Sequence, residues 1–171
     1  MKTIRKFSLA LLSMVLLFTL TSCGETGAVS VDTAKVEKSV LSVMNTALDT
    51  DFTNDESLRS KADYIWDKVD KNGRIFWTQS IYFPDGENGE RFWVKPIYDS
   101  DTFGEDSKFQ LTAFTEEELK KYENPSKELL AQIKQEIGSA DNYTKLTSLC
   151  VTARNISGKV YVVYVRELRS K

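Results

Sequence analysis

The apolar run Val-Tyr-Val-Val-Tyr-Val at residues 160–165 is the feature that most constrains the fold. Its side chains do not alternate between apolar and polar, so both faces of the segment must be buried, as in a strand at the centre of a sheet. The turn signal Asn-Ile-Ser-Gly at 155–158 precedes it. We therefore expect antiparallel strands over 144–154 and 159–168, with the second strand central in the sheet.

Helical periodicity marks two segments in the first half of the chain. The first is predicted over about 32–48, with the apolar stripe Val36, Val40, Val43, Met44 and Ala47. The second is predicted to begin at Thr53 and Glu56, which have capping-box spacing, and to stop at Gly73. Its stripe is Leu58, Ala62, Ile65 and Val69.

The middle of the chain predicts three strands followed by two more helices. Strands are expected over 74–83, 91–98 and 108–114, with Pro96 indicating an edge strand or a strand end. A capping box at Thr115 opens a short helix that ends before Asn124, and Pro125 suits the first position of a helix that stops at Gly138. The order ααβββααββ indicates one α+β domain over 31–171, an antiparallel sheet packed by amphipathic helices.

The first two strands are predicted to form a hairpin with two different faces. A register that pairs odd with even positions gives a core face of Ile75, Trp77, Ile81, Phe83, Phe92 and Val94. The opposite face then carries the candidate ligand-binding residues Phe76, Tyr82, Arg91, Trp93 and Lys95. Flat aromatic rings beside hydrogen-bonding and basic groups suit a protein, a glycan or a small ligand. The alternative is that helices cover this face too, which would make its aromatics part of the core.

Composition excludes several classes of chemistry. The chain has no histidine, which rules out Ser-His-Asp and Cys-His catalysis and any metal site with a histidine ligand. Without residues 1–22, which hold three basic residues and no acid, the chain has 20 basic and 25 acidic residues, a net charge of −5. That balance argues against a nucleic-acid partner. We expect no catalytic residues, metal or cofactor.

Two segments invite comparison with cation-binding or catalytic sites. Residues 68–79 partly match a calcium-binding loop, but Lys68 stands at its first ligand position and Gln79 at its twelfth, where carboxylates are needed. Residues 99–106 hold four carboxylates, which would suit calcium or a general acid and base. A solvated acidic loop is the simpler interpretation, so a carboxylate-based hydrolase is the least favoured function.

The N-terminus combines Lys2, Arg5 and Lys6 with about fourteen mostly apolar residues, too few to span a bilayer but typical of a secretory signal. It ends in Leu20-Thr21-Ser22-Cys23, which resembles the lipobox of bacterial lipoproteins. The resemblance implies cleavage after residue 22 and a diacylglycerol on Cys23, often with a further acyl chain such as palmitate. Residues 23–30 would then form a short tether. Gly24 in place of aspartate favours the outer membrane if the cell has one.

These observations predict a membrane-anchored protein of the cell envelope that acts by binding. The alternatives are an inhibitor or immunity lipoprotein against an envelope enzyme or toxin, and the hydrolase. The helix-then-sheet order resembles cystatin-like and nuclear-transport-factor-like domains, but the helices between the strand pairs depart from both families. With Cys23 acylated, Cys150 has no partner, and we expect it to be a small buried strand residue.

Overall fold

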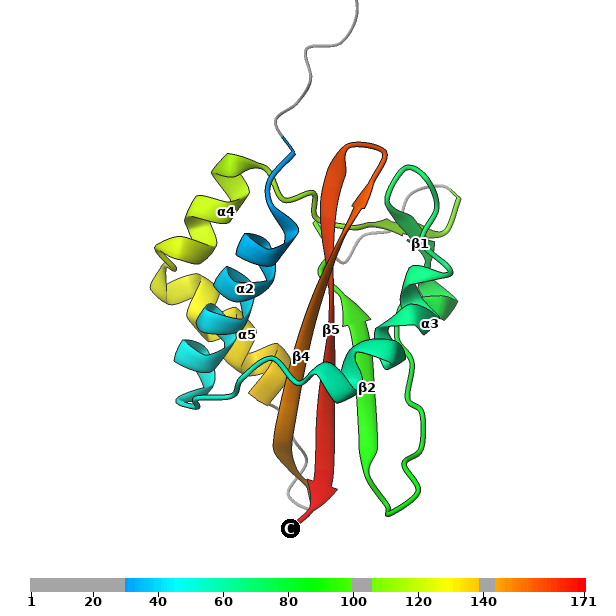
Figure 1. The fold of residues 1–171 in the computed structure, drawn as a ribbon, viewed down its shortest axis with the longest axis vertical. Coiled ribbons are helices and arrows are strands. Elements are labelled where there is room, and N and C mark those ends of the chain that lie inside the picture. Colours follow the sequence, from blue (N-terminus) through cyan, green and yellow to red (C-terminus); the bar gives the residue numbers. More distant parts are fainter. Residues whose placement is uncertain (1–29, 100–105, 139–143) are drawn as a thin grey trace, which may run out of the picture.

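A computed structural model describes residues 30–99, 106–138 and 144–171. The signal, Cys23, most of the tether and all but the ends of the acidic loop at 99–106 lie outside the described residues. The described chain is α+β, as predicted (Figure 1). Within the described ranges, none of the helices has the length and hydropathy needed to cross a bilayer.

The main sheet has three antiparallel strands in the order β2-β5-β4. The central strand is β5 (Lys159–Ser170), which contains the apolar run and confirms its predicted position. It lies between β4 (Thr144–Ile156) and β2 (Arg91–Pro96), an edge strand whose last residue is Pro96, as expected. A second sheet pairs β1 (Arg74–Phe76) with β3 (Lys108–Gln110).

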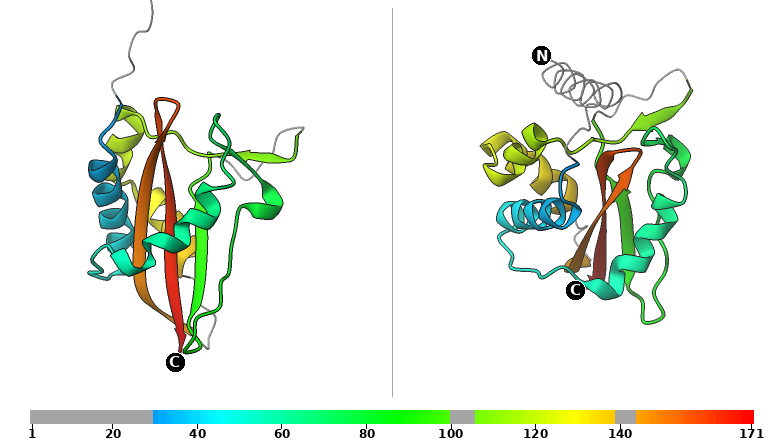
Figure 2. Two further views of the ribbon diagram at one scale, coloured as in Figure 1. Left: turned by 45° about the vertical axis from the view of Figure 1, so that its right-hand side comes forward. Right: turned by 45° about the horizontal axis from the view of Figure 1, so that its top comes forward.

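Helical layers cover both faces of the main sheet (Figures 1 and 2). On one face lie α2 (Thr33–Leu48), α4 (Glu116–Glu123) and α5 (Lys127–Gly138). The other face carries the 3-10 helix η1 (Glu56–Ala62) and α3 (Asp63–Trp66), next to the small sheet. Because side chains alternate along a strand, β5 supplies two cores: Val160, Val162 and Tyr164 face α2, whereas Tyr161, Val163 and Val165 face η1.

Helix boundaries follow local capping chemistry. The five predicted stripe residues of α2 are all buried, and the helix is capped by Asp32, whose side chain accepts from Ala34 N–H. Thr115 caps α4 as predicted, accepting from Glu118 N–H. Helix α5 begins at Lys127 rather than at a proline, because the Ser126 hydroxyl accepts from Leu129 N–H and fixes the start there.

The second predicted helix is wrong in its extent. Its cap is Asp55, which accepts from Ser57 N–H, and not Thr53. In place of the predicted long helix, the chain forms a 3-10 helix and then one α-helical turn. This turn ends at Trp66. Gly73 still has a structural role, because its φ is +72° and a Cβ there would lie 2.2 Å from the ring of Tyr161.

The predicted hairpin is wrong in its register and in the extent of its first arm, although residues 82–86 do pair with residues 90–94. Strand β1 ends at Phe76 and pairs with β3, because residues Trp77–Gln79 form the 3-10 turn η2 and interrupt the alternation. Tyr82 then bridges Val94, an even position with an even one. Ile75, Phe92 and Val94 are buried as expected, but Trp77 is 53% exposed and Phe83 is 61% exposed.

Candidate functional site

The structure divides the five predicted binding residues between three places. Arg91, Trp93 and Lys95 alternate along β2 and share the sheet face that α5 covers. Tyr82 lies on the opposite face, since it bridges Val94. Phe76 belongs to the small sheet. Only the three residues of β2 therefore belong to a common surface.

Tyr82 and Phe76 have local partners. The ring of Tyr82 stacks on Tyr64 with centroids 3.8 Å apart, and its side chain packs against the core under η1. Phe76 is 45% exposed, and the Lys108 ammonium lies 4.8 Å from its ring centroid. Phe76 and Tyr82, which were predicted to bind together with the β2 residues, therefore lie apart from the β2 face that carries Trp93.

Lys95 serves to attach α5 to the sheet. Its Nζ lies 2.6 Å from Glu136 Oε1, and its side chain is only 15% exposed. The same carboxylate oxygen accepts from the Tyr164 hydroxyl at 2.9 Å. Burial, followed by the charge of Glu136, raises the pKa of Tyr164 well above its ordinary value, so this hydroxyl stays a donor. These contacts leave Lys95 with a structural role.

Trp93 and Arg166 form a stacked cross-strand pair on this face. They are directly opposite in the β2–β5 register, and the guanidinium carbon lies 3.6 Å from the Trp93 ring centroid. Arg166 is 0% exposed although it is an arginine in the central strand. Its Nη1 donates to the carbonyl oxygens of Ile137 and Glu136 at the end of α5. The pair therefore joins both sheet strands to the helix.

Three buried donors of this pair have no hydrogen-bond partner. Among the described residues, such atoms are Arg166 Nε, Arg166 Nη2, Trp93 Nε1 and Arg74 Nε. Arg74 Nε has a carboxylate oxygen of Asp70 at 3.4 Å, which leaves the Trp93–Arg166 pair as the main concentration. Desolvation lowers the pKa of Arg166 to about 10, against the opposing effects of Tyr164 and Glu136. Buried unpaired donors cost free energy, so this concentration calls for a function.

A cavity of about 580 Å³ lies one residue pair further along the same face. Arg91 and Leu168, the next cross-strand pair on this side, belong to its lining, together with the hairpin loop and the ends of β4 and β5 (Asp85, Gly86, Gly89, Glu90, Thr144 and Ser170). The Arg91 side chain is exposed and forms no hydrogen bond or ion pair with another described residue. Phe83 lies beside Trp93 with centroids 5.4 Å apart. We call Phe83, Arg91, Trp93 and Arg166 the Trp93 site.

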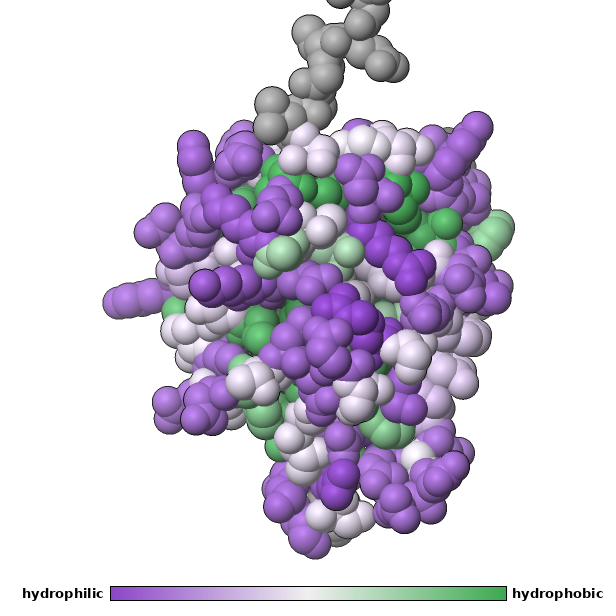
Figure 3. Space-filling model, in the orientation of Figure 1, coloured by the Kyte–Doolittle hydropathy of each residue, from purple (hydrophilic) through white to green (hydrophobic). Residues whose placement is uncertain are grey.

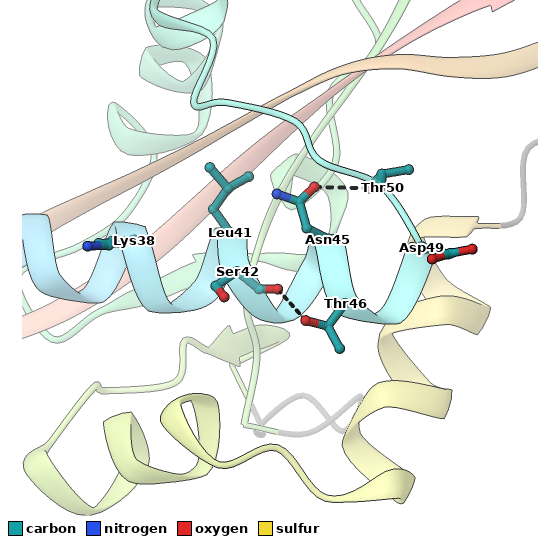
Figure 4. A pocket seen from close by; sticks show the side chains of 7 residues that line it. All are labelled: Lys38, Leu41, Ser42, Asn45, Thr46, Asp49 and Thr50. Carbon is teal, nitrogen blue, oxygen red and sulfur yellow. Dashed lines mark hydrogen bonds between the residues drawn. The ribbon is translucent and has the colours of Figure 1, made fainter.

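A second cavity, of about 480 Å³, lies along the outer side of α2 (Figure 4). Its polar side chains Asn45, Thr46 and Thr50 are engaged within the chain. Asn45 Oδ1 accepts from Thr50 Oγ1 at 2.9 Å and from Phe52 N–H at 3.0 Å, and Asn45 Nδ2 donates to Phe52 O at 2.8 Å. Asn45 therefore holds the segment after α2 in place, and this hollow is a consequence of chain packing.

The face over α2, η1 and α3 is mostly hydrophilic, with apolar atoms in small separate areas (Figure 3). It therefore offers no broad apolar contact surface. The Trp93 site lies on the sheet face that α2, α4 and α5 cover, beneath α5.

Sequence reasoning missed Phe83 and Arg166. Phe83 was assigned to the core because the interruption at η2 was not foreseen. Arg166 did carry a signal: it lies two positions after Tyr164 in a strand predicted to be central, so its side chain had to point into a covered face. A charge at such a position is rare in proteins and usually has a partner or a function.

Comparison with known proteins assigns no family, since no family model, curated protein or solved structure matches the chain.

Proposed function

We propose that the chain is a lipid-anchored protein of the bacterial cell envelope whose folded domain is a non-catalytic binding module. The lipobox-like sequence ending at Cys23 supports the anchor. The observation that supports binding is the Trp93 site, where an unengaged Arg91 lines a cavity of about 580 Å³ and a 61% exposed Phe83 lies against Trp93. Cavities of about 300–1,000 Å³ are typical of small-molecule sites.

The position of the site suits such an anchor. The described chain starts at Ser30, at one end of the long axis, whereas the cavity is lined by Ser170 next to the C-terminus at the other end (Figure 1). The 12 residues of β5, which run between these ends, span roughly 40 Å. A module tethered through Cys23 would hold the Trp93 site away from the lipid surface, open to ligands of the envelope.

The anchor is tested by growth with labelled palmitate. We expect label on the wild type and none on Cys23→Ala, because acylation requires the thiol of that residue. Equal labelling of both proteins would remove the anchor from the proposal.

The binding function is tested with the full-length protein against panels of glycans, peptides and envelope extracts. A double variant, Phe83→Ala with Arg91→Gln, changes the exposed part of the site. The matched control is Phe76→Ala, an exposed phenylalanine of the other sheet. We expect a ligand whose binding is lost in the double variant and kept in the control. Loss of binding in the control alone would contradict the proposed site.

A further inference from the structure

The free edge of Arg166 has the geometry of an oxyanion receptor. A guanidinium presents Nε and Nη2 side by side, with parallel N–H bonds that match the two oxygens of a carboxylate or a phosphate. In Arg166 this is the unpartnered edge, because the α5 carbonyls engage only Nη1. The contact with α5 and the stacking on Trp93 fix the plane in which the edge points.

The third unpartnered atom adds to the same preference. Trp93 Nε1 is a donor only, as are both nitrogens of the Arg166 edge. A complementary ligand must therefore supply oxygen acceptors, and the charge of Arg166 favours an anion. Arg91 adds a second positive charge at the wall of the adjoining cavity.

The two described acids next to Arg166 in the fold, Glu136 and Glu167, are engaged elsewhere, while Asp85 and Glu90 line the adjoining cavity. Glu136 Oε1 already accepts from Lys95 and Tyr164. Glu167 points to the opposite face of β5 and bonds Arg169 at 2.6 Å. Neither carboxylate accepts a hydrogen bond from Nε or Nη2 of Arg166.

We propose that the Trp93 site binds a small ligand through an oxyanion group, a carboxylate or a phosphate, which seats on Arg166 Nε and Nη2 and accepts from Trp93 Nε1. This inference rests on the proposed binding function and adds the chemistry of its ligand. A small ligand fits better than the surface of a protein partner, because the three donor atoms are closed to solvent. Arg91 offsets the carboxylates of Asp85 and Glu90, which line the adjoining cavity with it, and the exposed Phe83, whose ring lies against Trp93, is the side chain that moves to admit the anion.

The test is a titration of the full-length, nitrogen-15-labelled protein in a nonionic detergent, followed by NMR. Sodium phosphate and sodium acetate are the probes, and sodium chloride at equal ionic strength is the reference. We expect the Trp93 indole N–H and Arg166 Nε–H resonances to shift with a saturable dependence on one or both probes. The two probes distinguish a phosphate ligand from a carboxylate ligand.

Two variants at the site and one control distinguish bidentate hydrogen bonding by Arg166 from the effect of its positive charge alone. Arg166→Lys keeps the charge and loses the fork, so binding should weaken roughly tenfold, about the effect of one charge-assisted hydrogen bond. Trp93→Phe keeps a stacking ring and removes one donor, and it remains informative if the first variant fails to fold. The control is Arg154→Lys, an exposed arginine over the Trp66 ring that already has Asp63 as a partner. It should leave binding unchanged.

Several results would overturn the oxyanion site. One is no saturable shift with either probe, and another is equal binding by wild type and Arg166→Lys. An Arg166 Nε–H that is already hydrogen-bonded in anion-free buffer, unchanged by phosphate, would show an internal partner. Binding of an acidic peptide without free phosphate or acetate would favour a protein partner. If glycan or peptide binding still depends on Phe83 and Arg91, the proposed function stands and only the oxyanion is lost.

Discussion

The outer edge of β4 and the Trp93–Arg166 pair between β2 and β5 differ in how their polar groups are satisfied. Along the outer edge of β4, side chains from other elements take up backbone groups that would otherwise be free. Asn54 donates to Val151 O at 2.9 Å and accepts from Val151 N–H at 2.7 Å, and Glu37 accepts from Ala153 N–H at 2.8 Å. On the β2 side, three buried donors of Trp93 and Arg166 have no partner.

This difference separates a strand edge built for stability from a side-chain pair available for binding. An open strand edge invites pairing with another chain, and the cover on β4 prevents it. The chain thus satisfies polar groups thoroughly where only stability is at stake. Its failure to do so at the Trp93 site is therefore informative, because each unpaired donor carries a cost that a ligand would relieve.

Among the polar contacts compared, the largest expected effect is the opening of the covered β4 edge. Asn54→Ala should lower the free energy of unfolding by about 2 kcal/mol, because it leaves the N–H and C=O of Val151 without partners. Chemical denaturation measures the change. The control is Thr53→Ala, next in sequence and exposed, which should have almost no effect. Equal losses at both positions would mean that the edge cover contributes nothing specific.

Acid should weaken the same edge. Hydrogen bonds from Ser148 and Ser57 lower the pKa of Asp55, so its folded pKa lies below its unfolded value of about 3.9. Its contribution is therefore present above that value and is lost as pH falls through the folded pKa. Asp55→Asn should cost about 1 kcal/mol at pH 7, since a charge-assisted bond to Ser148 becomes neutral. Unfolding curves at pH 7 and near pH 2 should show that this difference disappears in acid, and a constant difference would exclude the carboxylate charge as its cause.

At the Trp93 site, removal of the buried charge should have a smaller effect. Arg166→Met should change the free energy of unfolding by less than about 1 kcal/mol, because an apolar side chain of similar length avoids the cost of unpaired donors. Denaturation at low and high phosphate measures it, and only the wild type should gain stability from phosphate. A loss of 3 kcal/mol or more would show that Nε and Nη2 of Arg166 also have internal partners, beyond the α5 carbonyls that Nη1 binds, and would end the contrast with the edge of β4.

The sequence predicted the parts of the fold that follow from periodicity within one segment. The stripe of α2, the cap at Thr115 and the central position of residues 160–165 depend on neighbours in sequence, and all three are confirmed. The hairpin register depends on the 3-10 turn η2, which interrupts the alternation of side chains between the two strand faces. No local sequence pattern predicts that turn. Strand pairing of β1 with β3 is likewise a tertiary choice.

The candidate site was predicted in part for the same reason. Arg91, Trp93 and Lys95 share a face because they alternate in one strand, which is a local property. Phe76 and Tyr82 were placed with them through a register that the fold does not use. Arg166 completes the site from another strand, and only the three-dimensional pairing shows that it stacks on Trp93.

The smallest effect on stability is expected for substitution of Phe83. This substitution tests most sharply the comparison between the β4 edge and the Trp93 site. Phe83→Ala should change the free energy of unfolding by no more than about 0.5 kcal/mol, because the side chain is mostly exposed. Phe92→Ala, a buried phenylalanine of β2, should cost about 3 kcal/mol or more. Thermal unfolding of both variants, beside the ligand titration, separates the two roles. If Phe83 admits the ligand, its variant keeps full stability and alters only binding. A stability loss close to that of Phe92 would make Phe83 a core residue, and the β2 side would then be as closed as the edge of β4.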